Sequence, residues 1–160
     1  MKTSTFINKS KWPARGEWDD EPDKAQWQDE STGLVCLALR ARSHWCGYVG
    51  VPEGHSAFQV EYDAVSEACD IDVHGGLTFS GFCQEGAGDD RICHIPESGQ
   101  PDRVWWLGFD CAHAGDFRPA EDDFRYPASC SYEQYRNLEY VKSECRSLAK
   151  QLASRGGSNG

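Results

Sequence analysis

The sequence predicts an α+β fold, a single domain in which an antiparallel sheet packs against one long C-terminal amphipathic helix. Two observations support this prediction. Apolar runs rich in strand-forming residues occur at 34–42, 45–51 and 103–111. Between residues 132 and 153, apolar residues recur at intervals of three and four, as they do on one face of a helix.

The first part of the domain is expected to hold one short strand and a hairpin. Residues 25–29 (AQWQD) read as the short strand, and Thr32 with Gly33 supplies a turn. Two strand-like runs follow at 34–42 and 45–51 with only a short polar gap between them. Such spacing indicates an antiparallel hairpin.

The middle of the chain predicts shorter elements. Residues 61–69 fit two turns of helix, and 71–82 begin as a strand that a glycine pair breaks or bulges. Residues 91–95 (RICHI) read as a short strand that ends before a proline. The run at 103–111 is the most complete strand after the hairpin.

The last element is a helix predicted over residues 132–153. Ser131 and Gln134 have the spacing of a capping box, which marks a helix start. A long acidic segment at 114–131, which holds two prolines, separates this helix from the last strand. A loop of that length inside one domain is usually functional or mobile.

The predicted boundaries are a polar N-terminal arm at 1–23, the domain at 24–153 and a disordered tail at 154–160. The first residues contain no apolar stretch of the kind that a secretory signal requires. We therefore expect a cytoplasmic protein.

Composition excludes several classes of protein. The chain has 16 basic and 26 acidic residues in 160, a formal charge of −10, so it is not expected to bind nucleic acid in general. No apolar run approaches the roughly 20 residues of a membrane span. With six Trp, seven Phe and six Tyr, the chain is too aromatic for a disordered acidic tail.

The eight cysteines form no CxxC pair, and most are expected to be reduced and buried. This expectation applies above all to three of them: Cys36, Cys69 and Cys145. Cys93 with His94, and Cys111 with His113, would together supply four nitrogen and sulfur ligands for zinc.

Alternation along the strand at 103–111 places Trp106 and Asp110 on one face, beside the space left by Gly108. A flat ring next to a cleared backbone is a platform on which a ligand can stack. The alternative is a Trp that covers the sheet and a solvated Asp. The same alternation in the preceding segment groups Asp72 and His74 away from the core, with Thr78 just beyond.

The densest group of reactive side chains is Asp110, His113 and Asp116, spaced by three residues at the end of a predicted strand. With His74 these residues would provide carboxylate and imidazole ligands for a divalent metal. Without a metal, a His beside a carboxylate is a general-base arrangement. Turn-capping hydrogen bonds are the structural alternative for both residue types.

Lys142, Arg146 and Lys150 repeat every four residues and form a basic row on the C-terminal helix. The row would suit a small anionic ligand or an acidic partner surface. Basic residues late in a helix also complement its dipole and solubilise its exposed face.

Several long strings resemble a group of short, uncharacterised proteins encoded by bacteriophages and prophages. They are VHGGLTFSGFC, RICHIP, VWWLGFDCAHAGD, YRNLEYVKSECRSLAKQL and WCGYVGVPEGH, and the resemblance covers about residues 17–153. It implies a phage origin and action in the cytoplasm of a bacterial host, but it implies no activity. By analogy, such accessory proteins act on host defence or regulation.

Three functions remain open. The first is a module that binds a small nucleotide-like ligand at His74, Trp106, Asp110 and His113, or that binds a host protein. The second is a small hydrolase, metal-dependent or based on His and Asp, that uses Asp116 as well. The third is a structural phage component. The oligomeric state is not predicted.

Overall fold

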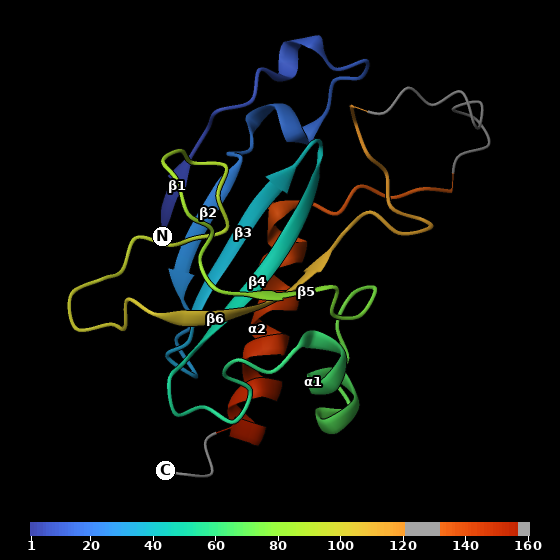
Figure 1. Ribbon diagram of the computed structural model, residues 1–160. Coiled ribbons are helices and arrows are strands. Elements are labelled where there is room, and N and C mark those ends of the chain that lie inside the picture. The colour runs from blue at the N-terminus through green and yellow to red at the C-terminus, as the bar shows by residue number, and fades with distance from the viewer. Residues whose placement is uncertain (121–131, 157–160) are drawn as a thin grey trace.

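The protein is described by a computed structural model that covers residues 1–120 and 132–156 (Figure 1). Its centre is a six-stranded antiparallel sheet with the strand order β1-β2-β3-β4-β6-β5. The strands are β1 (Lys2–Ser4), β2 (Lys24–Gln28), β3 (Val35–Ala41), β4 (His44–Pro52), β5 (Phe79–Gly81) and β6 (Val104–Asp110). The described residues also form the helices α1 (Tyr62–Cys69) and α2 (Leu138–Gly156) and two short 3-10 turns at Lys9–Lys11 and Glu17–Asp20, and this arrangement confirms the α+β prediction.

The predicted hairpin is formed by β3 and β4, in which Cys36 pairs with Val49. Side chains alternate between the two faces of these strands, as the pleat requires. Gly47 faces the helix, and a β-carbon there would lie 2.4 Å from Cζ of Phe109 and 2.8 Å from Sγ of Cys145. The missing side chain therefore lets α2 lie close against the sheet.

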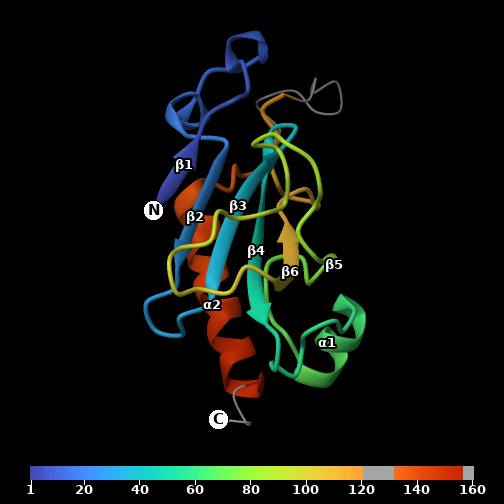
Figure 2. The ribbon, with the colours of Figure 1, turned by 60° about the vertical axis from the view of Figure 1, so that its left-hand side comes forward.

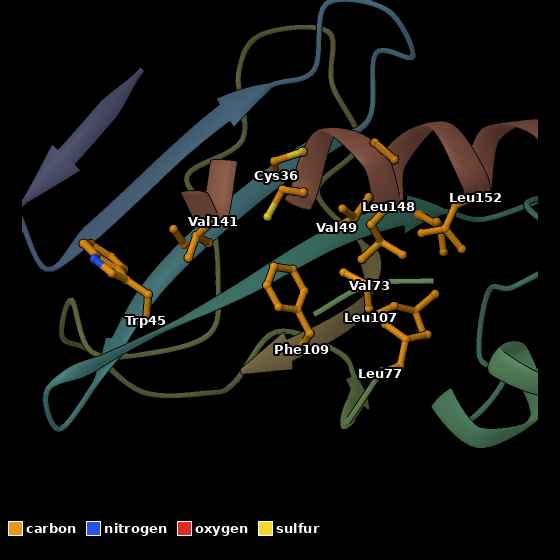
Figure 3. Close-up of a cluster of buried hydrophobic side chains, with 14 of the residues drawn as sticks. Cys36, Trp45, Val49, Val73, Leu77, Leu107, Phe109, Val141, Leu148 and Leu152 are labelled. Carbon is orange, nitrogen blue, oxygen red and sulfur yellow. The ribbon is translucent and has the colours of Figure 1, made fainter. Parts of the chain in front are cut away.

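The main core lies between α2 and the sheet (Figure 3). Leu107 and Phe109 of β6 face Val141 and Leu148 of the helix, and all four are almost fully buried. The apolar stripe of the helix was visible in the sequence, and burying it against these strands stabilises the fold. Cys36 and Cys145 are buried free thiols in this core, as expected, and Cys69 is a free thiol that is half-buried.

The opposite face of the sheet is covered by the segment at 82–103, which runs in front of the strands while α2 lies behind them (Figures 1 and 2). Here Ile92 packs with Leu37, Tyr48 and Trp106 in a second apolar cluster. Both faces of the central strands are therefore buried, which explains why their sequences are almost continuously apolar.

The N-terminal 23 residues, which the sequence suggested as a polar arm, pack against the domain. They include β1, which pairs with β2, and Trp18, which is buried. The carboxylate of Asp23 has no exposed surface and lies 2.6 Å from Nζ of Lys9 and 3.0 Å from Nε of Arg40. It also accepts the backbone N–H groups of Phe6 and Ile7. This buried carboxylate holds the arm against the domain together with the β1–β2 pairing and Trp18.

The strand predicted at 91–95 is absent, and of the one predicted at 71–82 only β5 (Phe79–Gly81) is formed. Residues 71–78 form no strand because side chains of α2 bind their backbone: Asp72 N–H donates to Gln151 Oε1 and His74 N–H donates to Glu144 Oε1, each at 2.8 Å. At 91–95, glutamine side chains accept the N–H groups of Ile92 and Ile95. Side chains thus replace the ladder that a strand would need.

The C-terminal helix begins at Leu138, six residues later than its apolar stripe predicted. The backbone of Gln134 instead forms a bridge with the 115–117 turn, and Tyr132 is exposed. Asn137 caps the helix by accepting the N–H of Tyr140 at 2.8 Å. The proposed capping residue Ser131 lies outside the described residues, as do 157–160 of the predicted tail.

The short helix α1 lies where two helical turns were predicted, and it packs on the core through Val65. Among the described residues, no helix has both the length and the apolar character needed to cross a bilayer.

Candidate functional site

The end of β6 gathers most of the residues that the sequence singled out. The segment after α1 passes this end and brings His74 and Thr78 to the turn that follows Asp110. Thr78 Oγ1 donates to Asp110 Oδ2 at 2.9 Å, and His74 Nε2 lies 2.8 Å from Asp116 Oδ2. We refer to His74, Asp110, His113 and Asp116 as the His–Asp cluster.

Asp116 is the buried anchor of this cluster, with 1% of its surface exposed. Its carboxylate accepts from His74 Nε2, from the backbone N–H of His113 at 3.0 Å and from Arg136 Nε at 3.0 Å. Burial raises its pKa, but these three donors outweigh that effect and lower the pKa below the usual 3.8. Asp116 therefore stays ionised and orients His74.

Both ring nitrogens of His74 are engaged. Nε2 lies 2.8 Å from Asp116 Oδ2, and Nδ1 lies 2.7 Å from the hydroxyl oxygen of Tyr140. The histidine therefore joins the β6 turn to α2, and neither of its nitrogens is left for a ligand. This half of the cluster is suited to positioning.

His113 and Asp110 form the more accessible half, with 36% and 27% of their side chains exposed. His113 Nε2 lies 3.1 Å from Asp110 Oδ1, within ion-pair distance but outside hydrogen-bonding geometry. The ring centroid is 6.1 Å from that of His74. A histidine beside a carboxylate at a partly open position is the arrangement that a general base needs.

Trp106 does not join the cluster. Its ring has no exposed surface, lies 5.3 Å from the ring of His94, and donates Nε1–H to Cys83 Sγ at 3.4 Å. The expected stacking platform is therefore covered by the 82–103 segment. Asp72 is also apart: it is exposed, and its backbone is bound to Gln151 of α2.

The four members of the His–Asp cluster do not converge as a metal ligand set. Each carboxylate instead bonds to protein donors, Asp116 to His74 and Arg136 and Asp110 to Thr78. In the described ranges, the group of three or more potential ligands that does converge is Cys83, Cys93 and His94.

The zinc site predicted from Cys93–His94 and Cys111–His113 is not formed. Cys111 is buried in the core on the α2 side, where burial raises its pKa, whereas Cys93 belongs to the segment on the opposite face. Cys93 is joined to Cys83 by a disulfide. The sheet therefore separates the two halves of the predicted ligand set.

A pocket of about 730 Å³ opens elsewhere, at the edge of the sheet where β2 ends. The basic row of α2 (Lys142, Arg146 and Lys150) forms one wall, and residues of the 82–103 segment, including His94 and Pro101, form another. Trp27, Gln28 and Asp29, at the end of β2, line the same space. We call this the edge pocket.

The edge pocket combines unpaired cations with a fixed acid. No hydrogen bond or close ion pair joins Arg146 or Lys150 to another residue of the described chain. Asp29 is buried, and its pKa is lowered despite burial because Thr32 and Ser31 donate to it and Arg146 is near. Gln28 Oε1 is also buried and has no hydrogen-bond partner in the described structure.

The sequence revealed the basic row but not the pocket that it lines. The row is a local pattern on one helix, whereas the pocket depends on how α2 and a distant loop meet the edge of β2. Trp27, Gln28 and Asp29 gave no signal beyond a short strand.

Comparison with known proteins assigns neither a family nor a function. No family model matches the chain, and neither a curated protein nor a solved structure matches it. Function is therefore inferred from the residues and their geometry.

Proposed function

We propose that the protein binds a small anionic ligand of the nucleoside phosphate class in the edge pocket. The observation that carries this proposal is the basic row: in a chain of net charge −10, three cations line one wall of a pocket of about 730 Å³. This volume lies in the range of small-molecule sites. Arg146 and Lys150 are available to bind phosphate oxygens.

Two further features support a ligand with a polar, aromatic part. Gln28 lines the pocket, and its side-chain amide can form hydrogen bonds with the edge of a base. The half-buried ring of Trp27 lines the same pocket and offers an apolar surface to a planar group. The proposed ligand site is therefore the edge pocket and not the cleft expected from the sequence at His74, Trp106, Asp110 and His113.

Titration calorimetry with nucleoside monophosphates and triphosphates tests the proposal, with the matching nucleosides as controls. Phosphorylated ligands are expected to bind, and Arg146→Gln to weaken their binding at least tenfold. Arg155→Gln removes the same charge from the same helix outside the pocket, and it should leave the affinity unchanged. Equal losses in both variants, or equal binding of nucleosides, would contradict a phosphate site.

Capture of such a ligand accords with the phage origin that the resemblance implies. An accessory protein that withdraws a nucleotide signal in the bacterial cytoplasm would act on host defence or regulation. Binding of a host protein by the same basic wall is the competing form of this function. It predicts that no nucleotide raises the melting temperature of the pure protein, whereas capture predicts such a rise.

A second candidate function is hydrolysis with His113 as general base. The observation that favours it is the partly exposed pair of His113 and Asp110, which rests on the anchored pair of His74 and Asp116. Assays with phosphate and acyl esters test it. Turnover that disappears in His113→Gln, with the fold retained, would support this role, and turnover that survives would exclude it.

A further inference from the structure

The segment that covers the second face of the sheet contains a group of three potential metal ligands. Cys83 and Cys93 are ten residues apart and joined by a disulfide, and His94 follows directly. Sγ of both cysteines and a ring nitrogen of His94 lie within 4.8 Å of one another. The group contacts Trp106 of β6: the Trp106 Nε1–H donates to Cys83 Sγ, and the Trp106 ring packs on the ring of His94.

The contacts of the His94 ring show which of its nitrogens carries the hydrogen and which one has a free lone pair. Nε2 lies 3.3 Å from the carbonyl oxygen of Pro101, which can only accept, so Nε2 carries the hydrogen. In the neutral ring, Nδ1 then presents its lone pair, and it lies 3.7 Å from Cys83 Sγ. His94 is 7% exposed, so water cannot readily satisfy this nitrogen.

This contact is not satisfied in the disulfide form. A disulfide sulfur has no hydrogen to donate, and Nδ1 has none either, so two lone pairs face each other across 3.7 Å. A thiol proton or a cation between the two atoms would turn the same geometry into a favourable contact. The Nε1–H of Trp106 already points at Cys83 Sγ and would stabilise a thiolate there.

We propose that Cys83, Cys93 and His94, in the dithiol form, bind one thiophilic divalent cation of the zinc class. In a tetrahedral site with Zn–S and Zn–N bonds of about 2.3 and 2.0 Å, neighbouring S and N ligands lie roughly 3.5 Å apart. The separation of 3.7 Å between Cys83 Sγ and His94 Nδ1 is close to this value. Three protein ligands leave a fourth position for water.

The charge and electron balance of the two forms is simple. Binding of Zn²⁺ to the dithiol releases two protons, so two thiolates neutralise the cation. A two-electron oxidant of the peroxide class converts the bound form to the disulfide: each sulfur gives up one electron, the S–S bond forms and Zn²⁺ leaves. The peroxide takes up the two electrons and two protons and becomes two water molecules. The site therefore exchanges metal for a disulfide.

The site is tested on the full chain, reduced with a phosphine in the absence of oxygen and titrated with Co²⁺ as a spectroscopic substitute for zinc. We expect one equivalent to bind and to give a thiolate-to-cobalt charge-transfer band, which one equivalent of Zn²⁺ abolishes. Addition of hydrogen peroxide should remove the band and release the metal.

Variants assign the ligands. Cys83→Ser should abolish the band, and His94→Gln should weaken Co²⁺ binding at least tenfold. Cys69→Ser is the matched control, because Cys69 is a free thiol in α1, away from the group. If Cys83→Ser does not fold, His94→Gln decides the question. A reduced, folded protein without the band, or variants that bind as the wild type does, would overturn the proposal.

Discussion

The ring of His113 lies directly over the backbone of Gly75. A β-carbon at Gly75 would come within 2.3 Å of His113 Cδ2 and Nε2, which is too close for any real side chain. The residue also has a φ of +68°, which glycine adopts without cost. The position of the accessible histidine therefore depends on a residue 38 positions away in sequence.

Gly75→Ala is expected to destabilise the fold and to displace His113. The control is Gly76→Ala, because Gly76 has a similar φ of +80° but open space where its β-carbon would be. The control should cost about 1 kcal/mol from backbone conformation alone. Gly75→Ala should cost clearly more in urea unfolding, since the clash adds about 1–3 kcal/mol. Equal losses would mean that His113 moves aside freely.

The buried and the partly exposed carboxylate of the His–Asp cluster are expected to differ in how much each contributes to the free energy of unfolding. Asp116→Asn leaves Arg136 and His74 without their charged partner, and it should lower the free energy of unfolding by about 3 kcal/mol at pH 7. Asp110→Asn, at a site with 27% exposure, should lower it by less than about 1 kcal/mol.

The acid limb of the stability curve checks the same carboxylate. The pKa of Asp116 in the folded state is below the usual 3.8, so its contribution is fully present above that pH and is lost as the pH falls further. The wild type should therefore lose more stability on acidification below pH 3.8 than Asp116→Asn does. Parallel curves would show that the carboxylate is not coupled to folding.

Asp23→Ala should release the N-terminal 23 residues from the domain. The substitution removes the acceptor that holds Lys9, Arg40 and the backbone N–H groups of Phe6 and Ile7. Limited trypsin digestion should then cleave rapidly after Lys11 or Arg15. Asp19→Ala removes a carboxylate that only contacts Arg15 and the N–H of Gly16 within the same short turn, and it should leave cleavage slow.

His55 makes the fold sensitive to mild acid. Its Nε2 contacts the carbonyl oxygen of Leu152 at 3.0 Å, and its Nδ1 accepts the N–H of Ala57 at 3.0 Å, so the ring must be neutral. Burial lowers its pKa below 6.5, although the bond to Leu152 acts in the other direction. The stability that the neutral ring supplies is therefore present above pH 6.5 and is lost as the pH falls below it.

Urea unfolding at pH 7.5 and pH 5.5 measures this effect. The wild type should lose stability between the two values, by about 1 kcal/mol or less, the scale of one hydrogen bond. His55→Gln should be less stable at pH 7.5 and should show a smaller difference between the two pH values. An unchanged difference in the variant would assign the pH dependence to other groups.

The sequence by itself determined the elements whose signals are local and repetitive. The hairpin of β3 and β4 and strand β6 follow from continuous apolar runs of strand-forming residues, because both faces of these strands are buried. The apolar face of α2 follows from periodicity, because a buried helix face imposes a spacing of three to four. The same periodicity misplaced the start of α2 by six residues, since Tyr135 packs on the core without being helical.

The candidate sites were decided by tertiary structure. The sequence identified His74, Asp110, His113 and Asp116, but not that they divide into a buried pair and an accessible pair. Their partners come from distant positions: Tyr140 of α2 contacts His74 from 66 residues away, and Arg136, just before α2, contacts Asp116 from 20 residues away. It also placed Trp106 on an open face that the 82–103 segment covers. Which face is open depends on long-range packing, which local patterns do not encode.

The edge pocket and the group of Cys83, Cys93 and His94 show the same division. The basic row and the Cys-His pair can be recognised in the sequence, but the pocket exists only where a helix, a strand end and a loop meet. Cys93 is bonded to Cys83, ten residues earlier. It does not meet Cys111, because the sheet lies between Cys93 and Cys111. Sequence spacing specifies which side chains exist, and chain folding specifies which of them lie within reach of one another.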